Sequence, residues 1–319
     1  MIVTVTLNAA VDRTLTVPNF QLGHRHRASA ALTLAGGKGI NVARALKRLG
    51  VPVVATGLAG GRTGTRIVEE LQGEAILNDF VQIDGESRTS TAVVDPTGSS
   101  YTEINEWGPA VSAAELQILL EKLEYLAQGA DMVVFAGSLP REVEPDFYGE
   151  AIRAVNRAGV RTALDSDGEP LRLGVEAGPY LVSPNQREAE GLVGQELNDE
   201  EDFQLALDRI REMGARNVLI TQESGCLALL REDGELRRFR ATVPRVDPVS
   251  TVGAGDVLLA AYLAARVAGR PAEEALRAAV AAGAASALDV GAGRFDPRQA
   301  ARLQTGVEVT ELEPVASEI

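Results

Sequence analysis

Two patterns of apolar and polar positions alternate along most of this 319-residue chain. Short apolar runs that end in glycine, as at 52–58 and 131–136, are typical of buried parallel strands, and further strands are predicted at 1–7, 161–165, 180–182 and 217–221. In the segments between these runs, apolar residues recur at the spacing of a helix. A helix with a capping box is predicted from Ser112 and Glu115 to about residue 127, and another over about 200–213. The alternation predicts a mostly parallel sheet with helices on both faces.

Two stretches depart from this alternation of strands and helices. Residues 13–34 and 86–106 hold alternating Thr, Val and Ser with turn residues and little helical period, which predicts strands of a small separate sheet. A small β-sheet appended to an α/β core suits a lid over a site. We therefore expect a single domain over 1–319 that carries this lid.

Composition narrows the class of protein. There are 31 Lys and Arg residues against 45 Asp and Glu, a net charge of −14, which disfavours binding to nucleic acid or to an anionic membrane. The one cysteine, Cys226, excludes an intrachain disulfide and a cysteine-cluster zinc site. The first residues lack the features of a signal peptide, and no long apolar stretch is free of charge and glycine. We expect a cytoplasmic protein.

Polar turns follow several of the predicted strands. They are Asn8 to Asp12, Gly137 to Pro140 and Ser183 to Glu188. In a doubly wound sheet, ligands bind at the carboxyl ends of the strands, so these turns are expected to face one crevice.

The segment Val252-Gly253-Ala254-Gly255-Asp256 stands directly before a long apolar run. Two glycines allow close approach of backbone N–H groups to an anion, and the helix dipole adds positive charge there. A carboxylate at this place could take a proton from a hydroxyl that attacks a phosphoryl group. The alternative interpretation is that Asp256 only caps the helix.

A second glycine turn, Gly36-Gly37-Lys38-Gly39, opens a helix that carries Asn41. It suits a small anionic molecule, but it has neither the spacing of a Walker A loop nor that of a dinucleotide fingerprint. The alternative is that its glycines serve packing and Lys38 lies in solvent. The two histidines, His24 and His26, lie outside every motif, which excludes a Ser-His-Asp hydrolase of the usual form.

Four motifs in order carry a resemblance to a known family. They are AGGKGINVA at 35–43, GSLP at 137–140, Asn185-x-x-Glu188 and STVGAGD at 250–256. Together they resemble the ribokinase-like (PfkB) family of carbohydrate kinases over nearly the whole chain. The resemblance implies a ribokinase-like three-layer α/β fold with a mostly parallel central sheet, flanking helices and a small β-sheet lid. Within the family, the chain looks most like the 1-phosphofructokinase and tagatose-6-phosphate kinase branch.

The resemblance assigns roles around the sugar. Asp256 would be the catalytic base, and the N–H groups of Gly253, Ala254 and Gly255 would form the anion hole. Asp12, Gly37 and Asn41 would bind the sugar hydroxyl groups. Lys38, Arg88 and Arg27 would be the cations for the phosphate already on the sugar. Ser138, the serine of the GSLP stretch, would also bind the substrate. The alternative for Arg27 and Arg88 is a solvated strand face.

The resemblance also implies a nucleotide site. Asn185, Thr221, Ser224 and Gly225 would contact ATP, with the adenine near Ala282. Glu188 would hold Mg²⁺ through water, although it could equally be an ordinary helix-start carboxylate. Relatives bind a monovalent cation such as K⁺ with carbonyls matching Ser250, Val252 and Ala287.

Three residues depart from the family pattern near the proposed nucleotide. They are Ser183, Gln222 and Glu223, and they leave out a positive charge and add a negative one. Weaker ATP binding or a different nucleotide preference is the resulting hypothesis.

The expected function is ATP- and Mg²⁺-dependent phosphorylation of fructose 1-phosphate to fructose 1,6-bisphosphate. Tagatose 6-phosphate and fructose 6-phosphate are the alternative substrates within the same chemistry. A non-catalytic sugar-phosphate-binding regulator has no need of Asp256, and a kinase of a nucleoside or small alcohol has no need of Lys38 and the arginines. Homodimerisation through the open edge of the small sheet is a further expectation.

Overall fold

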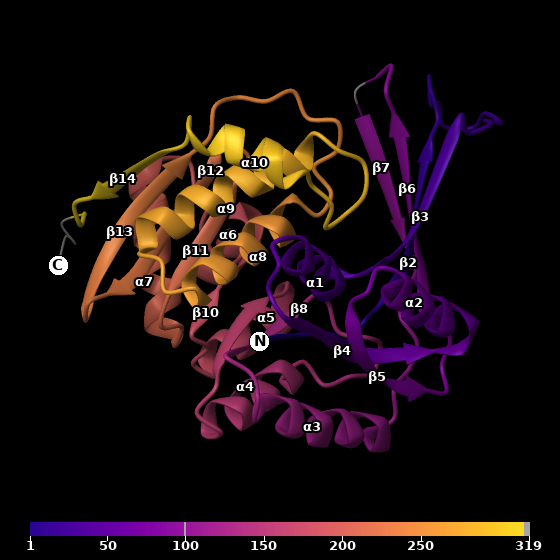
Figure 1. Ribbon diagram of the computed structural model, residues 1–319, viewed down its shortest axis with the longest axis horizontal. Coiled ribbons are helices and arrows are strands. Elements are labelled where there is room, and N and C mark those ends of the chain that lie inside the picture. The colour runs from indigo at the N-terminus through magenta and orange to yellow at the C-terminus, as the bar shows by residue number, and fades with distance from the viewer. Residues whose placement is uncertain (99, 316–319) are drawn as a thin grey trace.

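The computed structural model describes residues 1–98 and 100–315, and within them the chain forms a ten-stranded sheet and a separate four-stranded sheet (Figure 1). Seven neighbouring strands of the large sheet are parallel. Their order is β11 (Val218–Gln222), β10 (Leu181–Val182), β9 (Arg161–Asp165), β8 (Met132–Ala136), β1 (Ile2–Thr6), β4 (Val53–Gly60) and β5 (Leu77–Ile83). The strands predicted from the apolar runs are thus confirmed.

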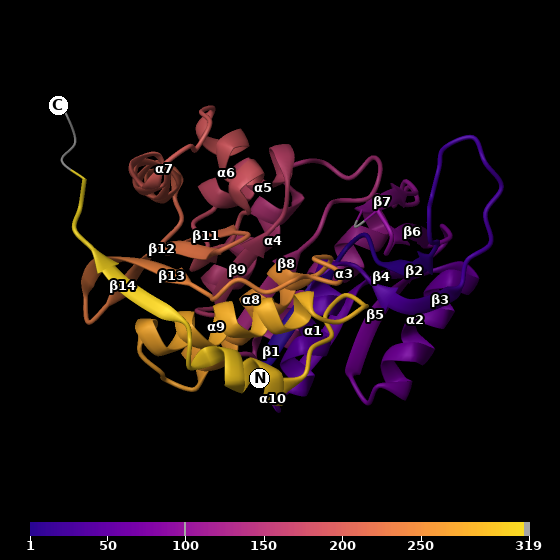
Figure 2. The ribbon, with the colours of Figure 1, turned by 90° about the horizontal axis from the view of Figure 1, so that it is seen from above.

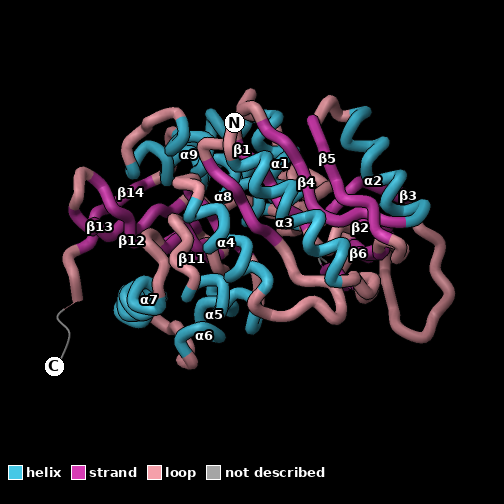
Figure 3. Tube along the Cα trace, turned by 90° about the horizontal axis from the view of Figure 1, so that it is seen from below, coloured by secondary structure: helices cyan, strands magenta, loops and turns pink. Residues whose placement is uncertain are grey.

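Helices cover both faces of this sheet, as Figures 2 and 3 show from opposite sides. One face packs against α1 (Lys38–Arg48), α2 (Gly61–Gly73), α8 (Ala254–Val267), α9 (Ala272–Ala287) and α10 (Pro297–Gln304). The other packs against α3 (Ala113–Ala127), α4 (Phe147–Arg157), α5 (Gly168–Glu176), α6 (Gln186–Val193) and α7 (Glu200–Met213). The helix predicted over 200–213 is α7, and the capping box of Ser112 and Glu115 begins α3.

The large sheet has one apolar core on each face, because successive side chains along a strand point to opposite faces. On β1, Ile2 packs into one core and Val3 into the other. On β8, Val134 packs into the first core, whereas Val133 and Phe135 pack into the second. Because both faces of these strands are covered, β8 is apolar throughout, and β1 is apolar except for the buried Thr4 and Thr6.

The small sheet stands apart from the large one (Figure 1). Its order is β3 (Ala30–Gly36), β2 (Ala10–Thr16), β6 (Arg88–Asp95) and β7 (Ser100–Asn105), and β2 and β6 are parallel neighbours. Residues 13–34 and 86–106 thus supply a small sheet as predicted, with residue 99 outside the described part. The sheet extends further toward the core than predicted, because β2 begins at Ala10 and β3 runs to Gly36, directly before α1.

Three antiparallel strands extend one edge of the large sheet. They are β12 (Gly225–Glu232), β13 (Glu235–Thr242) and β14 (Glu308–Leu312). The sequence did not predict them, because the outer two carry many charged residues and little apolar period. Within the described residues, none of the helices is long and apolar enough to cross a membrane.

Candidate active site

A cavity of about 810 Å³ lies at the carboxyl ends of the parallel strands, beneath the small sheet. Turns after β1, β8, β9 and β10, together with Thr221 near the end of β11, contribute to its wall, as the doubly wound topology requires. Twelve residues expected at the site line it: Asp12, Gly37, Lys38, Asn41, Arg88, Ser138, Asn185, Glu188, Thr221, Gly253, Gly255 and Asp256.

One face of the small sheet closes the cavity from the other side. Strand register places Asp12 beside Ser90, and Ser90 beside Asn105, so three strands present a polar row. Tyr101 and Glu103 lie on the same face of β7 as Asn105, since side chains two apart share a face. The small sheet therefore contributes chemistry to the cavity as well as cover.

Asp12 fits its place because Gly36, on the neighbouring strand, has no side chain. A Cβ on Gly36 would lie 1.9 Å from Asp12 Oδ2, within its carboxylate. Burial raises the pKa of Asp12 to about 6, while the positive charges of Arg88 and Arg44 oppose that rise. Asp12 is thus a half-buried carboxylate that faces the polar cavity.

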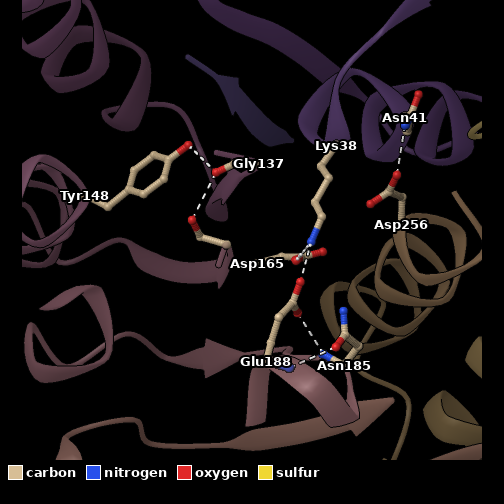
Figure 4. A network of polar contacts seen from close by, with 9 residues as sticks. Lys38, Asn41, Gly137, Tyr148, Asp165, Asn185, Glu188 and Asp256 are labelled. Carbon is tan, nitrogen blue, oxygen red and sulfur yellow. Dashed lines mark hydrogen bonds and ion pairs between the residues drawn. The ribbon is translucent and has the colours of Figure 1, made fainter. Parts of the chain in front are cut away.

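Asp256 lies in the first turn of α8, whose N-cap is Gly253 in the left-handed conformation with φ of 79°. The helix has no side-chain cap, so the interpretation of Asp256 as a capping residue is wrong. Its Oδ2 instead accepts a hydrogen bond of 2.8 Å from Asn41 Nδ2 (Figure 4). Burial, together with the negative charge of Asp165, raises the pKa of Asp256 to about 7, against the opposing charge of Lys38.

The glycine turn before α8 presents part of its backbone to the cavity. Gly253 and Gly255 line it, whereas Ala254 does not. The Ala254 N–H donates to Thr251 O at 3.2 Å, which closes the turn. The three N–H groups expected to act alike are therefore not equivalent in this structure.

Lys38 reaches across the cavity to two carboxylates. Its Nζ lies 2.7 Å from Asp165 Oδ1 and 3.2 Å from Glu188 Oε1 (Figure 4). Burial disfavours the ammonium charge, but the negative charges of Asp165 and Glu188 outweigh it and raise the pKa of Lys38. The alternative that places Lys38 in solvent is wrong. Its glycine neighbour does serve packing, because a Cβ on Gly39 would lie 2.4 Å from Thr6 Oγ1.

Asn185 and Glu188 form a capping box at the start of α6. Asn185 Oδ1 accepts from the Glu188 N–H at 2.9 Å, and Glu188 Oε2 accepts from the Asn185 N–H at 2.8 Å. Both side chains also line the cavity, so the helix-start role and a ligand-binding role are compatible. Burial raises the pKa of Glu188, while the charge of Lys38 opposes this.

Arg88 is the cation that the small sheet brings to the cavity. Its Nε donates to Asn8 O at 3.2 Å and its Nη1 to Glu106 O at 3.5 Å. Within the described residues, Arg88 makes no ion pair closer than 4 Å to a carboxylate. Burial lowers the pKa of Arg88. Its guanidinium therefore faces the cavity without a direct ion pair among the described residues, within reach of the negative charges of Asp12, Glu103, Asp167 and Glu106.

Besides Ala254, four of the expected site residues do not line the cavity. Arg27 is exposed on the loop between β2 and β3, and Ser224 is exposed in the turn before β12. Gly225 is buried as the first residue of β12. Ala282 is 1% exposed within the core of α9, where packing rather than an open surface surrounds it. Their assigned roles stay predictions.

One of the three carbonyl groups expected to bind a monovalent cation is already engaged in hydrogen bonds. The Ala287 carbonyl oxygen accepts hydrogen bonds from the Val249 N–H at 2.7 Å and the Ser250 N–H at 3.1 Å. A carbonyl oxygen has two lone pairs, so Ala287 does not fit the role of cation ligand here.

Sequence reasoning missed several residues that line the cavity. The most important is Asp165, the last residue of a strand that was itself predicted, so the rule on strand carboxyl ends could have found it. Trp107 lies under the Arg141 guanidinium, whose carbon is 5.2 Å from the ring centroid, and carries no local motif. The other missed lining residues include Thr6, Ser90, Tyr101, Glu103, Asn105, Glu106 and Asp167, whereas Asn8 and Leu139 lie in turns that were expected to face the crevice.

Comparison with known proteins agrees with this fold. The model of the pfkB family carbohydrate kinases matches residues 3–299. The 1-phosphofructokinase of Bacillus subtilis is 36% identical over 312 residues, which cover 98% of this chain and 100% of the relative. The 1-phosphofructokinase of Borreliella burgdorferi is 34% identical, with coverage of 90% and 92%.

A solved structure shares the architecture. The phosphofructokinase-2 of Escherichia coli in complex with potassium superposes with a TM-score of 0.88 at 30% identity, covering 95% of this chain and 98% of the other. The ribokinase-like fold and the resemblance to the family are thereby confirmed. The chain belongs to the pfkB family of carbohydrate kinases, which are phosphotransferases with an alcohol group as acceptor.

Proposed function

We propose that the protein is a 1-phosphofructokinase, which transfers the γ-phosphoryl group of ATP to fructose 1-phosphate and forms fructose 1,6-bisphosphate and ADP. The observation that carries this proposal is the Asn41–Asp256 hydrogen bond inside a cavity that also holds the unpaired cation Arg88. The similarity to 1-phosphofructokinases over nearly the whole chain supports the choice of substrate.

Asp256 is the base in this proposal. The sugar hydroxyl oxygen forms the new bond to the γ-phosphorus, the bond from that phosphorus to ADP breaks, and the hydroxyl proton goes to Asp256. A pKa of about 7 suits a group that must hold and release a proton near neutral pH. Gly253 and Gly255 lie beside Asp256 at the start of α8, where backbone N–H groups stabilise developing negative charge.

The sugar phosphate is proposed to lie between the two sheets. Asp12, Gly37, Asn41 and Ser138 face the sugar, whose hydroxyl groups suit carboxylate, amide and hydroxyl partners. Arg88 binds the existing phosphate, because a guanidinium pairs with phosphate in a bidentate manner.

Two further cations would complete the phosphate site. Lys38 has a third N–H donor beside those directed at Asp165 and Glu188, and Arg27 can contribute only by movement of the β2–β3 loop. Such movement is the basis for proposing that the small sheet acts as a lid on a single kinase domain over 1–319.

The nucleotide is proposed to bind along Asn185 and Thr221, with Ser224, Gly225 and Ala282 nearby. Glu188 and Asn185 supply the hard oxygen donors that Mg²⁺ prefers, so the residues present fit this ion with water in its shell. Bound there, Mg²⁺ would neutralise charge on the nucleotide phosphates.

A monovalent cation is proposed near the Ser250 and Val252 carbonyls, without Ala287. The support is the potassium complex of the E. coli relative. The test is the turnover rate in KCl compared with NaCl and with tetramethylammonium chloride at equal ionic strength, and equal rates in all three salts would contradict it.

A homodimer through the small sheet is also proposed. Leu22, Tyr101 and Ile104 are exposed apolar residues on this sheet and its loop, and burial in an interface would remove them from water. Sedimentation equilibrium would show a monomer if this is wrong. The free, buried Cys226 and the use of ATP and a sugar phosphate support a cytoplasmic location.

The decisive experiment is a coupled assay of ADP formation over fructose 1-phosphate, fructose 6-phosphate, tagatose 6-phosphate, fructose and ribose. We expect the highest kcat/KM with fructose 1-phosphate. A higher value with either of the other phosphates would assign the chain to that substrate, whereas equal turnover of unphosphorylated sugars would refute a sugar-phosphate kinase. Binding without turnover of any substrate would identify a non-catalytic regulator.

A further inference from the structure

Arg44 occupies an unusual place behind the cavity. It lies on α1, one turn after Asn41, and is only 2% exposed, although its side chain is charged and does not line the cavity. The guanidinium has five N–H groups, and every one donates a hydrogen bond. The acceptors are Glu74 Oε2 at 2.7 Å, Glu74 Oε1 at 3.0 Å, Ala35 O at 2.7 Å, Ala292 O at 3.1 Å and Asn41 Oδ1 at 3.3 Å.

The bond to Asn41 determines which way its amide faces. A guanidinium donates and cannot accept, so the side of Asn41 that meets Arg44 must be the oxygen. The amide nitrogen then faces Asp256, to which it donates at 2.8 Å. Rotation of the amide by half a turn would place oxygen against the Asp256 carboxylate and nitrogen against the guanidinium, which are two repulsive contacts.

Arg44 also secures the backbone behind the glycine turn of α8. The Ala292 carbonyl that it binds belongs to a segment packed tightly between α1 and that turn. A Cβ on Gly253 would lie 2.8 Å from Ala292 Cα, and one on Gly293 would lie 2.6 Å from Asn41 O. The segment leaves no space for Asn41 or Gly253 to shift.

The charge of Arg44 is compensated at the end of α2. Glu74 accepts two of its hydrogen bonds in a bidentate pair. This ion pair offsets the desolvation cost of burying the guanidinium. The remaining donors are then available for Asn41 and the two carbonyls. A lysine has three donors and no fixed fork, so it could not satisfy the same set of acceptors.

We propose that Arg44 is a positioning residue for phosphoryl transfer, which fixes the Asn41 amide so that this amide holds the Asp256 carboxylate toward the reacting hydroxyl. The inference rests on the proposed role of Asp256 as the base. It adds a residue outside the cavity, and outside the glycine motifs, to the machinery of the reaction.

The test is steady-state kinetics of Arg44→Met against a matched control. Arg48 lies one turn further along α1 and donates to Phe295 O at 2.8 Å in the same neighbouring loop, without contact to Asn41. We expect Arg44→Met to lower kcat at least tenfold with the KM for ATP within threefold of wild type. Arg48→Met should keep kcat within twofold. Equal losses in the two variants would overturn the assignment, because loop anchoring alone would explain them.

A double-mutant cycle separates positioning from a general structural effect. If Arg44 acts through Asn41, Arg44→Met lowers kcat in the wild-type background but changes it by less than twofold in an Asn41→Ala background. A tenfold loss in both backgrounds refutes the inference. Arg44→Lys keeps a cation beside Glu74. It replaces Arg44→Met in the cycle if the methionine variant fails to fold. The same losses are expected, and wild-type kcat in the lysine variant refutes the role of the guanidinium.

Failure of the inference and failure of the proposed function give different results. If Asp256→Asn retains activity, the proposed base is wrong whatever Arg44 does. If Asp256→Asn is inactive and the Arg44 variants turn over normally, only the role of Arg44 is wrong.

Discussion

Lys38 Nζ lies 2.7 Å from Asp165 Oδ1, and this ion pair joins the first turn of α1 to the end of β9. A cation expected to bind a sugar phosphate is thus already compensated by carboxylates when the cavity holds no anion. An arriving phosphate must compete with Asp165 and Glu188 for Lys38. Arg88 makes no direct ion pair within the described residues, although the charges of Asp12 and Glu103 act on it, and it is the better first contact for an anion.

Asp256→Asn should lower kcat by about 10²–10⁴-fold, the range expected for loss of a general base. The amide is nearly the same size as the carboxylate and its oxygen can still accept from Asn41, so the Kd for the sugar phosphate should stay within about threefold. Turnover by rapid quench and Kd by calorimetry measure the two effects. A rate near that of wild type would show that Asp256 is not the base.

The same variant should be more stable than wild type at alkaline pH. The pKa of Asp256 is raised from 3.8 to about 7, so between these values the folded protein binds more protons than the unfolded chain, and the free energy of unfolding falls as pH rises. Asparagine has no charge to bury. We expect Asp256→Asn to gain about 1–4 kcal/mol at pH 8, shrinking toward pH 5.

Urea denaturation of both proteins at the two pH values measures this difference. A gain that is the same at pH 5 and pH 8 would rule out the buried charge as its cause.

Gly36→Ala should raise the KM for the sugar substrate at least about tenfold with little loss of stability. The new Cβ would lie 1.9 Å from Asp12 Oδ2, and the carboxylate, at the end of a short side chain, would have to turn out of its place. Gly191→Ala is the control, because the position is inside α6 and a Cβ there meets nothing within 4 Å. Comparable KM changes in both variants would remove the argument from Asp12.

Trp107 should report ligand binding directly. It is the one tryptophan of the chain, it lines the cavity, and it is 78% exposed. A sugar phosphate that excludes water from the ring should shift its fluorescence emission to shorter wavelength. The titration is measured with fructose 1-phosphate and repeated on Trp107→Phe, which should show no shift. Calorimetric binding without any spectral change would place the ligand away from this wall.

Glu223→Gly should tighten ATP binding. Glu223 lies in the turn between β11 and β12, next to Gln222 and two residues after Thr221, which lines the cavity. Removal of a like charge near the nucleotide phosphates should lower the Kd for ATP about two- to fivefold at low salt, less at high salt. An unchanged Kd at low salt would dismiss the charge explanation.

The apolar runs and their spacing were enough to predict the parallel strands, because a strand covered on both faces is mostly apolar. The same criterion failed for β13 and β14, whose charged side chains pair across the sheet edge, as Arg237 does with Glu311. Turn motifs identified Lys38 and Asp256 as site residues. They could not reveal that Lys38 faces Asp165, since that contact joins residues 127 positions apart and depends on the order of strands in the sheet.

The small sheet is joined to the large one by four short connections: β1 to β2, β3 to α1, β5 to β6, and β7 to α3. Three of them pass the cavity wall, through Asn8, Gly37 or Trp107 and its neighbours, and the β5–β6 connection leads directly into Arg88, the first residue of β6, which lines the cavity. A hinge confined to one connection is therefore not available to this chain. Opening of the site must move all four connections together. Entry of the sugar and the arrangement of the residues that recognise it therefore occur in the same motion.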